Sequence, residues 1–210
     1  MRIVEKNRVR GQQYVLTLEG GEFDEVTVDA ATFDESSFGV GGCIDHEQLA
    51  RLLGTSRYSR AKSRALYYLA GRDYAAKELE RKLYRCTDRE TAAQVVARLT
   101  EVGLVDDAAY AARLAHTLLT YKRYPKRRVL QTLQEKGVAR HLAEAALEEL
   151  EADDFQQALA LIQKKYYNKV QDWEDRQKTI AALARYGFPY DVVRRAVEVA
   201  ADRQNEEDWY

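Results

Sequence analysis

Apolar positions divide the chain into a short strand-like segment and a much longer helical one. Residues 13–18 and Glu25–Asp29 alternate apolar and polar residues or are rich in β-branched and aromatic residues, a pattern typical of strands. Gly20 and Gly21 lie between these stretches and indicate a hairpin turn. Residues 32–42, rich in Gly and Ser, follow as an expected loop. The first 30 residues therefore predict a small β-hairpin.

The pattern becomes helical after this loop. Asp45 is suited to cap a short helix that carries Leu49 and Leu52 and ends before Gly54. From Ser56 onward, apolar residues recur at intervals of three or four, the period of a helix with one buried face. The first of these stripes consist of Ala61, Ala65, Leu69, Leu79, Leu83, Val95, Val96 and Leu99.

The order of apolar and glycine positions in the helical part repeats. Two sets of leucines have constant spacings: at 50 residues Leu83, Leu133 and Leu183, and at 45 residues Leu69, Leu114 and Leu159. The helix–Gly–apolar–helix order around Gly137 recurs around Gly187. Such self-similarity is the signature of a repeat architecture.

The sequence thus predicts a mainly α protein with three tandem three-helix repeats. We expect a β-hairpin and short helix at 1–54, repeats at 55–105, 106–152 and 153–205, and an acidic tail at 206–210. A three-helix unit buries part of its apolar stripe against its neighbours, so the repeats should form an extended, curved array.

Several polar residues are placed to begin or end helices. Thr87 and Glu90 form a capping-box pair before one helix, and Gly103 suits the position after its end. Asp106 is placed to cap the next helix, with Asp107 in its first turn. These two carboxylates resemble a catalytic or metal-binding pair, but no His or third carboxylate accompanies them. Structural caps are the favoured interpretation.

Composition excludes several classes of protein. The chain is 46% hydrophobic and 32% charged, with 11 Gly and 2 Pro, which is compatible with a folded core and disfavours a turn-rich β fold. No apolar run approaches the ~18 residues of a membrane span, and the first residues lack a signal-peptide core. Two Cys and three His, all far apart, fit neither a disulfide scaffold nor a metal site. We expect a cytoplasmic protein without a metal.

Catalysis is also disfavoured. Cys43 and Cys86 have no His beside them in the sequence, and no nucleophile–base grouping is present. The chain has no Gly-rich phosphate-binding loop of the Walker type, so it should not hydrolyse ATP itself. We therefore predict no catalytic residue, no cofactor and no small-molecule substrate.

Charge is segregated although the net charge is only −1. Residues 1–54 carry a net −5 and the remainder a net +4. Residues 110–140 contain eight basic side chains against Glu135 alone, and residues 141–154 contain six carboxylates and no Lys or Arg. Such separation can steer a charged partner onto one face. Solvated helix faces whose charges cancel at short range are the alternative interpretation.

Three basic clusters interleaved with tyrosines are candidate binding surfaces. Cluster 1 consists of Arg57, Arg60, Lys62 and Arg64; cluster 2 of Lys122, Arg123, Lys126, Arg127 and Arg128; and cluster 3 of Lys164, Lys165 and Lys169. Cationic side chains suit phosphate or carboxylate partners, and tyrosine rings can stack on unpaired bases. Arg72, where a helix should end, is a further candidate; it either contacts a partner or pairs with a nearby carboxylate.

Three local patterns resemble those of the RecX family of bacterial recombination regulators. The patterns are Ala65-Leu66-x-x-Leu69 followed by Arg72 and Glu78-Leu79-x-x-Lys82-Leu83; Leu99-x-x-x-Gly103-Leu104-x-Asp106-Asp107-x-x-Tyr110-Ala111; and Leu183-x-x-x-Gly187-Phe188 leading to Val192-Val193. The second pattern is the most specific. Together they cover roughly residues 56–200. Two positions depart from the family: Ala75 stands where a capping Ser is usual, and Tyr124-Pro125 where Gly is frequent.

The resemblance implies a non-enzymatic regulator. Members of the family bind the filament that the RecA recombinase forms on single-stranded DNA, and inhibit strand exchange and ATP hydrolysis. We accordingly expect a monomer that lodges in the filament groove across adjacent subunits, with weak or filament-mediated contact to single-stranded DNA. A stand-alone nucleic-acid-binding module, a repressor or single-strand binder, is the alternative; the isoelectric point near 6.4 disfavours it.

Overall fold

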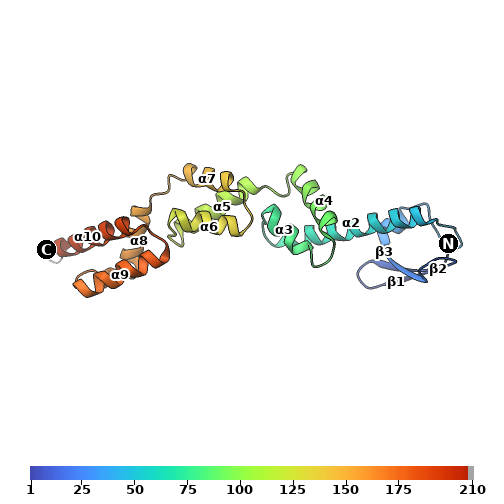
Figure 1. Ribbon diagram of the computed structural model, residues 1–210, viewed down its shortest axis with the longest axis horizontal. Helices are drawn as coiled ribbons and strands as arrows, with labels where there is room; N and C mark the ends of the chain where they lie inside the picture. Colours follow the sequence, from blue (N-terminus) through green and yellow to red (C-terminus); the bar gives the residue numbers. More distant parts are fainter. Residues whose placement is uncertain (208–210) are drawn as a thin grey trace. The chain divides into compact units, whose positions relative to one another are not determined.

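The computed structural model describes the backbone of residues 1–207 and the side chains up to residue 203. The chain divides into two compact units, and the division falls between Val105 and Asp106 (Figure 1). Helices dominate both units, and the only sheet among the described residues is at the N-terminus. This confirms the mainly α fold. Of the predicted acidic tail, residues 208–210 lie outside the described residues.

The N-terminal sheet is a three-stranded antiparallel meander. It contains β1 (Arg2–Val9), β2 (Gln13–Glu19) and β3 (Glu25–Asp29), in that order. The expected hairpin is β2–β3, and β1 extends it on the other side of β2. A short helix, α1 (Ala30–Asp34), begins at the Asp29 cap and occupies the start of the predicted loop.

Helix α2 (His46–Gly71) runs without interruption through Gly54, so the prediction of a short helix ending before that residue is wrong. Glycine costs a helix roughly 1 kcal/mol relative to alanine, which is small beside the packing on either side. Before Gly54, Leu49 and Leu52 pack with the sheet; after it, Ala61 and Ala65 pack with the first repeat. The two cores together hold the helix continuous.

The three repeats each contain three helices. Repeat 1 comprises the second half of α2, α3 (Ala76–Leu83) and α4 (Arg89–Glu101). Repeat 2 comprises α5 (Asp107–Thr120), α6 (Lys126–Glu135) and α7 (Arg140–Glu149). Repeat 3 comprises α8 (Asp154–Lys165), the 3-10 turn η1 (Tyr167–Lys169), α9 (Trp173–Tyr186) and α10 (Tyr190–Glu207).

The burial of side chains distinguishes the two predicted spacings. Leu83, Leu133 and Leu183 are all buried at equivalent places in the second helix of their repeats. The spacing of 45 does not mark equivalent core positions, because Leu69 and Leu114 are only half-buried. The buried first-helix positions of repeats 1 and 2 also lie 50 residues apart: Ala61 and Ala65 in α2, and Ala111 and Ala115 in α5.

Most of the expected helix ends are where the sequence placed them. The Asp106 carboxylate accepts a hydrogen bond from the Ala109 amide at 2.9 Å and caps α5, with Asp107 in the first turn. Gly103 follows the end of α4 with a φ of +74°, a conformation that side chains with a Cβ rarely adopt. The α4 start differs from the prediction.

Asp88, and not Thr87, caps α4. Its carboxylate accepts from the Thr91 amide at 2.8 Å and from the Thr91 hydroxyl at 3.0 Å, and it also pairs with Arg57 at 3.0 Å. The predicted capping box would have paired Thr87 with Glu90. The Asp88 carboxylate instead makes three contacts, two with Thr91 and one with Arg57. These hydrogen bonds lower the pKa of Asp88 from 3.8 to about 2.

We expect the Asp88 carboxylate to make the chain acid-sensitive. Because its pKa is depressed on folding, its stabilising contribution is complete above pH 4 and is lost as the pH falls through about 2. Asp88→Asn keeps a capping side chain but removes the titrating group. Thermal unfolding followed by circular dichroism from pH 5 to pH 2 should therefore show a steeper loss of stability in the parent protein than in Asp88→Asn. Parallel curves would contradict the assignment.

Candidate basic binding surfaces

The basic residues predicted to bind a partner divide into two groups. Some have an internal acceptor and hold the fold together, whereas others project from it without an ion pair. The difference matters because a cation that is already paired contributes less to binding an external anion.

Arg57 and Arg72 have internal partners. Arg57 reaches from α2 to the Asp88 cap of α4. Arg72 follows the end of α2 and donates to Glu78 on α3 at 2.9 Å, while its guanidinium lies 3.8 Å from the centre of the Tyr74 ring. This hydrogen bond raises the pKa of Arg72 further above its ordinary range. Of the two roles that the sequence left open for Arg72, this structure therefore shows the pairing with a nearby carboxylate.

The rest of cluster 1 lies on exposed positions of α2. Arg64 donates to the Tyr68 hydroxyl at 3.3 Å, which raises the pKa of the arginine, and its guanidinium lies 5.1 Å from the centre of the Tyr68 ring. With its amide oxygen turned toward α2, Gln13 accepts from Arg60 at 2.7 Å and 3.1 Å. Lys62 is exposed. None of these three residues has an ion pair among the described side chains.

Arg60 and Arg64 line a pocket of about 550 Å³. Its walls come from the β1–β2 turn, α2 and the turn between α3 and α4. Its lining residues are Gly11, Gln12, Gln13, Asp29, Arg60, Ala61, Ser63, Arg64, Tyr67, Tyr68, Arg85 and Cys86. The sequence interpretation included Arg60 and Arg64 but missed Arg85 and Tyr67. Arg85 has basic neighbours in the sequence, Arg81, Lys82 and Arg89, but only the folding of α3 beside α2 brings it to this pocket.

Cluster 2 is divided between the fold and the surface. Arg128 is half-buried against the rings of Tyr124 and Tyr186, at 4.1 Å and 4.2 Å from their centres, and the two rings contact each other edge to face. It also donates to the Tyr186 carbonyl at 3.2 Å, across the junction of repeats 2 and 3. Lys126 and Arg127, by contrast, are exposed at the start of α6.

Further contacts complete this junction. Burial, together with the neighbouring Tyr124, raises the pKa of Tyr186, so its hydroxyl stays protonated and donates to the Lys122 carbonyl at 3.1 Å. The Asp154 carboxylate on α8 accepts from the Lys126 amide at 2.7 Å. Pro125 has no capping side chain, so the α6 N-terminus receives its side-chain acceptor from the next repeat.

The glycine after α9 also belongs to the junction. Gly187 has a φ of +113°, and a Cβ there would lie 3.4 Å from Pro125 and 3.7 Å from the Arg128 Cβ. Tyr124-Pro125, the departure from the family pattern noted in the sequence, is therefore part of the contact between two repeats. Arg123, with a φ of +52°, makes the turn into α6.

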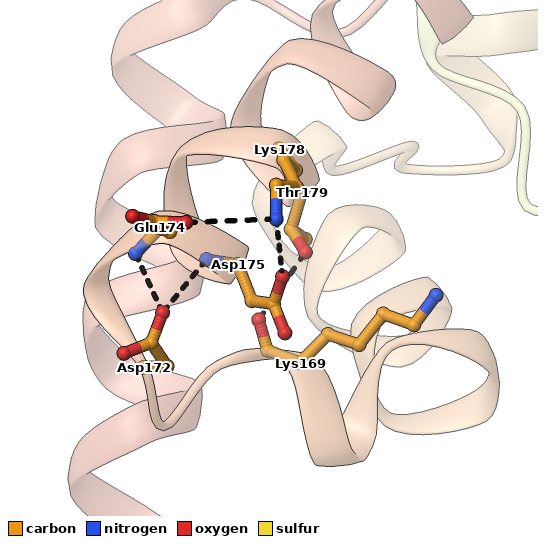
Figure 2. Close-up of polar contacts among 6 residues, drawn as sticks. All are labelled: Lys169, Asp172, Glu174, Asp175, Lys178 and Thr179. Carbon is orange, nitrogen blue, oxygen red and sulfur yellow. Dashed lines mark hydrogen bonds and ion pairs between the residues drawn. The ribbon is translucent and has the colours of Figure 1, made fainter.

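Cluster 3 surrounds the end of α8. Lys164 and Lys165 lie in its last turn, where positive charge complements the helix dipole. Figure 2 shows the Lys169 side chain extending away from Asp172 and Asp175, while its carbonyl accepts from the Thr179 hydroxyl at 3.3 Å. All three lysines are exposed and have no ion pair among the described residues.

The carboxylates near Lys169 have other partners. Asp172 caps α9 by accepting from the Glu174 and Asp175 amides at 2.8 Å and 3.3 Å, and Lys178 pairs with Asp175 at 3.0 Å (Figure 2). The amino group of Lys169 is therefore exposed and has no ion pair with Asp172 or Asp175. Cluster 3 consequently presents three cations that are not neutralised by these acids.

Neither a metal site nor a membrane span is present in the part of the chain that the structure describes. No group of three or more His, Cys, Asp or Glu is gathered there in a way that could hold a metal ion. Among the same residues, no helix combines the length and apolar character that crossing a bilayer requires.

A small N-terminal sheet followed by three tandem three-helix domains defines a helical repeat protein. Matches to the first, second and third three-helix domains of RecX cover residues 61–99, 106–147 and 151–197. The Regulatory protein RecX of Clostridioides difficile is 31% identical over 162 residues, covering 75% of this chain and 76% of that one. The chain belongs to the RecX family of regulatory proteins.

Other relatives agree with this assignment. The Regulatory protein RecX of Stenotrophomonas maltophilia strain R551-3 is 35% identical over 141 residues, covering 66% of this chain and 86% of that one. A crystal structure of regulatory protein RecX superposes with a TM-score of 0.64 at 23% identity, covering 91% of this chain and 96% of that one. The RecX structure from Lactobacillus salivarius gives 0.61 at 22% identity, covering 70% and 97%. These two structural likenesses support the fold.

The neighbours Arg127 and Arg128 provide a test of the division within cluster 2. Arg128→Ala should lower the free energy of unfolding by about 1–3 kcal/mol, because it leaves the Tyr186 carbonyl without its charged donor and opens the stack of rings. Arg127→Ala, at an exposed position, should change it by less than about 0.5 kcal/mol. Urea unfolding of both variants measures the difference. Equal effects would show that Arg128 does not hold the junction.

Proposed function

We propose that this chain binds the filament of the RecA recombinase on single-stranded DNA and inhibits its recombinase and ATPase activities. The proposal includes the mode of binding: the repeats lodge in the filament groove and contact adjacent subunits. Membership in a family whose members are named regulatory proteins supports the regulatory role. Family membership does not by itself identify the recombinase as the partner or the filament groove as the binding site, so these two points are the content of the proposal.

The observation that carries the proposal is the threefold repetition of one helical design. Each of repeats 1, 2 and 3 buries a leucine at the same place, Leu83, Leu133 and Leu183, and matches its own family domain. A filament offers the same surface once per subunit. A protein built from successive similar modules can therefore make several weak contacts at once, and each contact raises the effective concentration of the next.

The unpaired cations provide the chemistry for these contacts. In repeats 2 and 3, Lys126, Arg127, Lys164, Lys165 and Lys169 are exposed and have no ion pair among the described residues. Phosphates of the bound strand and acidic side chains of recombinase subunits are both suitable partners. Since exposed ion pairs are screened by salt, binding should weaken as the ionic strength rises.

Inhibition by such a protein requires no catalysis. A rigid module held across two subunits favours one filament geometry over the others, and ATP hydrolysis falls when that geometry is not the active one. Subunit addition is blocked in the same way when a contact surface is covered. Both effects should scale with occupancy of the filament.

The direct test is the DNA-dependent ATPase of purified recombinase on single-stranded DNA. Titration with this chain should reduce the rate progressively, and raising the salt should shift the curve to higher protein concentration. Absence of inhibition at a concentration equal to that of the recombinase would overturn the proposal. Tight binding to naked DNA of selected sequence, without inhibition, would favour the stand-alone nucleic-acid-binding module instead.

The contact surface can be tested without disturbing the fold. Reversing the exposed pair in Lys126→Glu/Arg127→Glu should raise the concentration needed for half inhibition by about tenfold or more, since two favourable charge contacts become repulsive. The matched control is Arg185→Glu, an exposed arginine of α9 outside the three clusters. Arg128 is left unchanged in this test because of its place in the junction. A similar shift in both variants would remove cluster 2 from the contact surface.

A further inference from the structure

The pocket between the sheet and repeat 1 has the features of a nucleotide-binding site. Three guanidinium groups, from Arg60, Arg64 and Arg85, line it. None of the three has an ion pair among the described carboxylates. Other arginines of the first unit, Arg57, Arg72 and Arg98, each pair with an acid, whereas the three in the pocket lining share one site.

The one carboxylate in the lining does not neutralise these arginines. Asp29 accepts from the Thr32 amide and hydroxyl at 3.1 Å and from the Ser59 hydroxyl at 3.2 Å. These three donors all bind the Asp29 Oδ2 atom, and no ion pair among the described residues joins Asp29 to a lining arginine. Arg60 uses two of its five N–H groups on Gln13 and Arg64 uses one on Tyr68, so each guanidinium retains donors for a ligand. Planar arginine forks suit phosphate oxygens, which accept two parallel hydrogen bonds.

An aromatic ring lies beside the cations. Tyr67 is 68% exposed, although it occupies a helix with a buried face on the other side. The neighbouring Tyr68 already has Arg64 and Lys82 over its ring, at 5.1 Å and 4.7 Å. Tyr67 has Arg64 at 5.4 Å and the tilted Tyr68 ring at 6.2 Å, and its large exposed fraction leaves a surface for a flat ligand. Base stacking on such rings is tolerant of sequence.

The wall opposite α2 is held in place by the backbone. The β1–β2 turn passes through Gly11 and Gln12, with φ values of +80° and +57°, and the Gln12 carbonyl accepts from the Ala30 amide at 2.9 Å. Gln13 connects the same wall to Arg60. The pocket volume of about 550 Å³ lies within the range of small-ligand sites.

We propose that this pocket binds one nucleotide of a single-stranded nucleic acid, with a backbone phosphate at Arg60, Arg64 and Arg85 and the base against Tyr67. Because Tyr67, Arg85 and Cys86 are all exposed, the strand can enter and leave along the surface. Outside the lining, the residues on either side of Arg85 offer a similar pair of groups, since the Arg89 guanidinium lies 5.6 Å from the centre of the exposed Tyr84 ring. This inference goes beyond the proposed filament binding and does not depend on it.

Binding of a fluorescent oligothymidylate to the full chain, measured by anisotropy without recombinase, tests the residues. Arg85→Ala combined with Tyr67→Leu should raise the dissociation constant on the order of tenfold or more. Tyr67→Phe keeps the ring and should bind like the parent protein. Lys77→Ala, at an exposed lysine of α3 outside both the lining and the three clusters, is the matched charge control and should have a much smaller effect.

Three outcomes of the anisotropy experiment would overturn the proposal. An unchanged dissociation constant in Arg85→Ala/Tyr67→Leu would overturn the proposal, as would equal weakening by Lys77→Ala and Arg85→Ala. Competition by polyglutamate as effective as by unlabelled oligothymidylate would also overturn it, because an acidic peptide would then be the preferred ligand. Circular dichroism of every variant confirms that the fold is retained.

The two cysteines provide an independent measurement on the unmutated protein. Both are exposed, but Cys86 lines the pocket and Cys43 does not. Saturating oligothymidylate should slow maleimide labelling of Cys86 severalfold, as read by peptide mass spectrometry, and leave the rate at Cys43 unchanged. Equal rates with and without bound strand at Cys86, or equal protection of both thiols, would contradict the proposed site. Failure here would leave the filament proposal to be judged by its own ATPase assay.

Discussion

The first unit depends on a single helix that serves two hydrophobic cores. Helix α2 packs Leu49 and Leu52 against the sheet and, two turns later, Ala61 and Ala65 against repeat 1. Because both cores are attached to one continuous helix, the sheet and the first repeat form one compact unit and are not separate domains on a linker. Because the helix is continuous, its period determines the direction in which each side chain of residues 53–60 leaves it.

The stretch of α2 between the two cores is polar, and its polar groups are satisfied. Ser56 is buried and accepts from the Asp29 amide at 2.6 Å, and Ser59 donates to the Asp29 carboxylate. A buried hydroxyl without a partner would cost the fold, whereas these contacts join the end of β3 to the helix. Arg60 and Arg64 leave the helix from this same stretch, next to a wall that the sheet supplies. The candidate nucleotide pocket is thus a consequence of how the two cores are joined.

The periodic spacing of apolar residues was sufficient to predict the three repeats. Local sequence preferences were not sufficient to predict every helix end. The spacing of 50 residues between buried leucines and the Asp106 cap are local or periodic signals, and both are confirmed. The helix break at Gly54 and the Thr87 cap are wrong for the same reason: a local preference of small size was overruled by contacts from distant residues. The sheet and repeat 1 hold Gly54 in a helix, and Arg57 adds to the preference for Asp88 as the cap.

The candidate surfaces show a similar division. Charge clusters could be found from the sequence, but the roles of neighbouring residues could not, since Arg127 is exposed and Arg128 packs against two rings that come from different repeats. The pocket at Arg60 combines residues 11–13, 60–68 and 85–86. No pattern in the sequence indicates that a hairpin turn and an interhelical turn approach the same face of α2. Only the tertiary fold brings them together.

The cap that α8 provides for α6 has a consequence for biosynthesis. During translation, residues 126–135 emerge from the ribosome before Asp154, and well before the Tyr186 that holds Arg128. Until those later residues appear, the amide at the α6 start has only water as a partner, and the arginine has the Tyr124 ring but not the Tyr186 ring to pack against. Repeat 2 therefore reaches its final structure only after most of repeat 3 has been synthesised, and the second unit matures as one vectorial folding step near the end of synthesis.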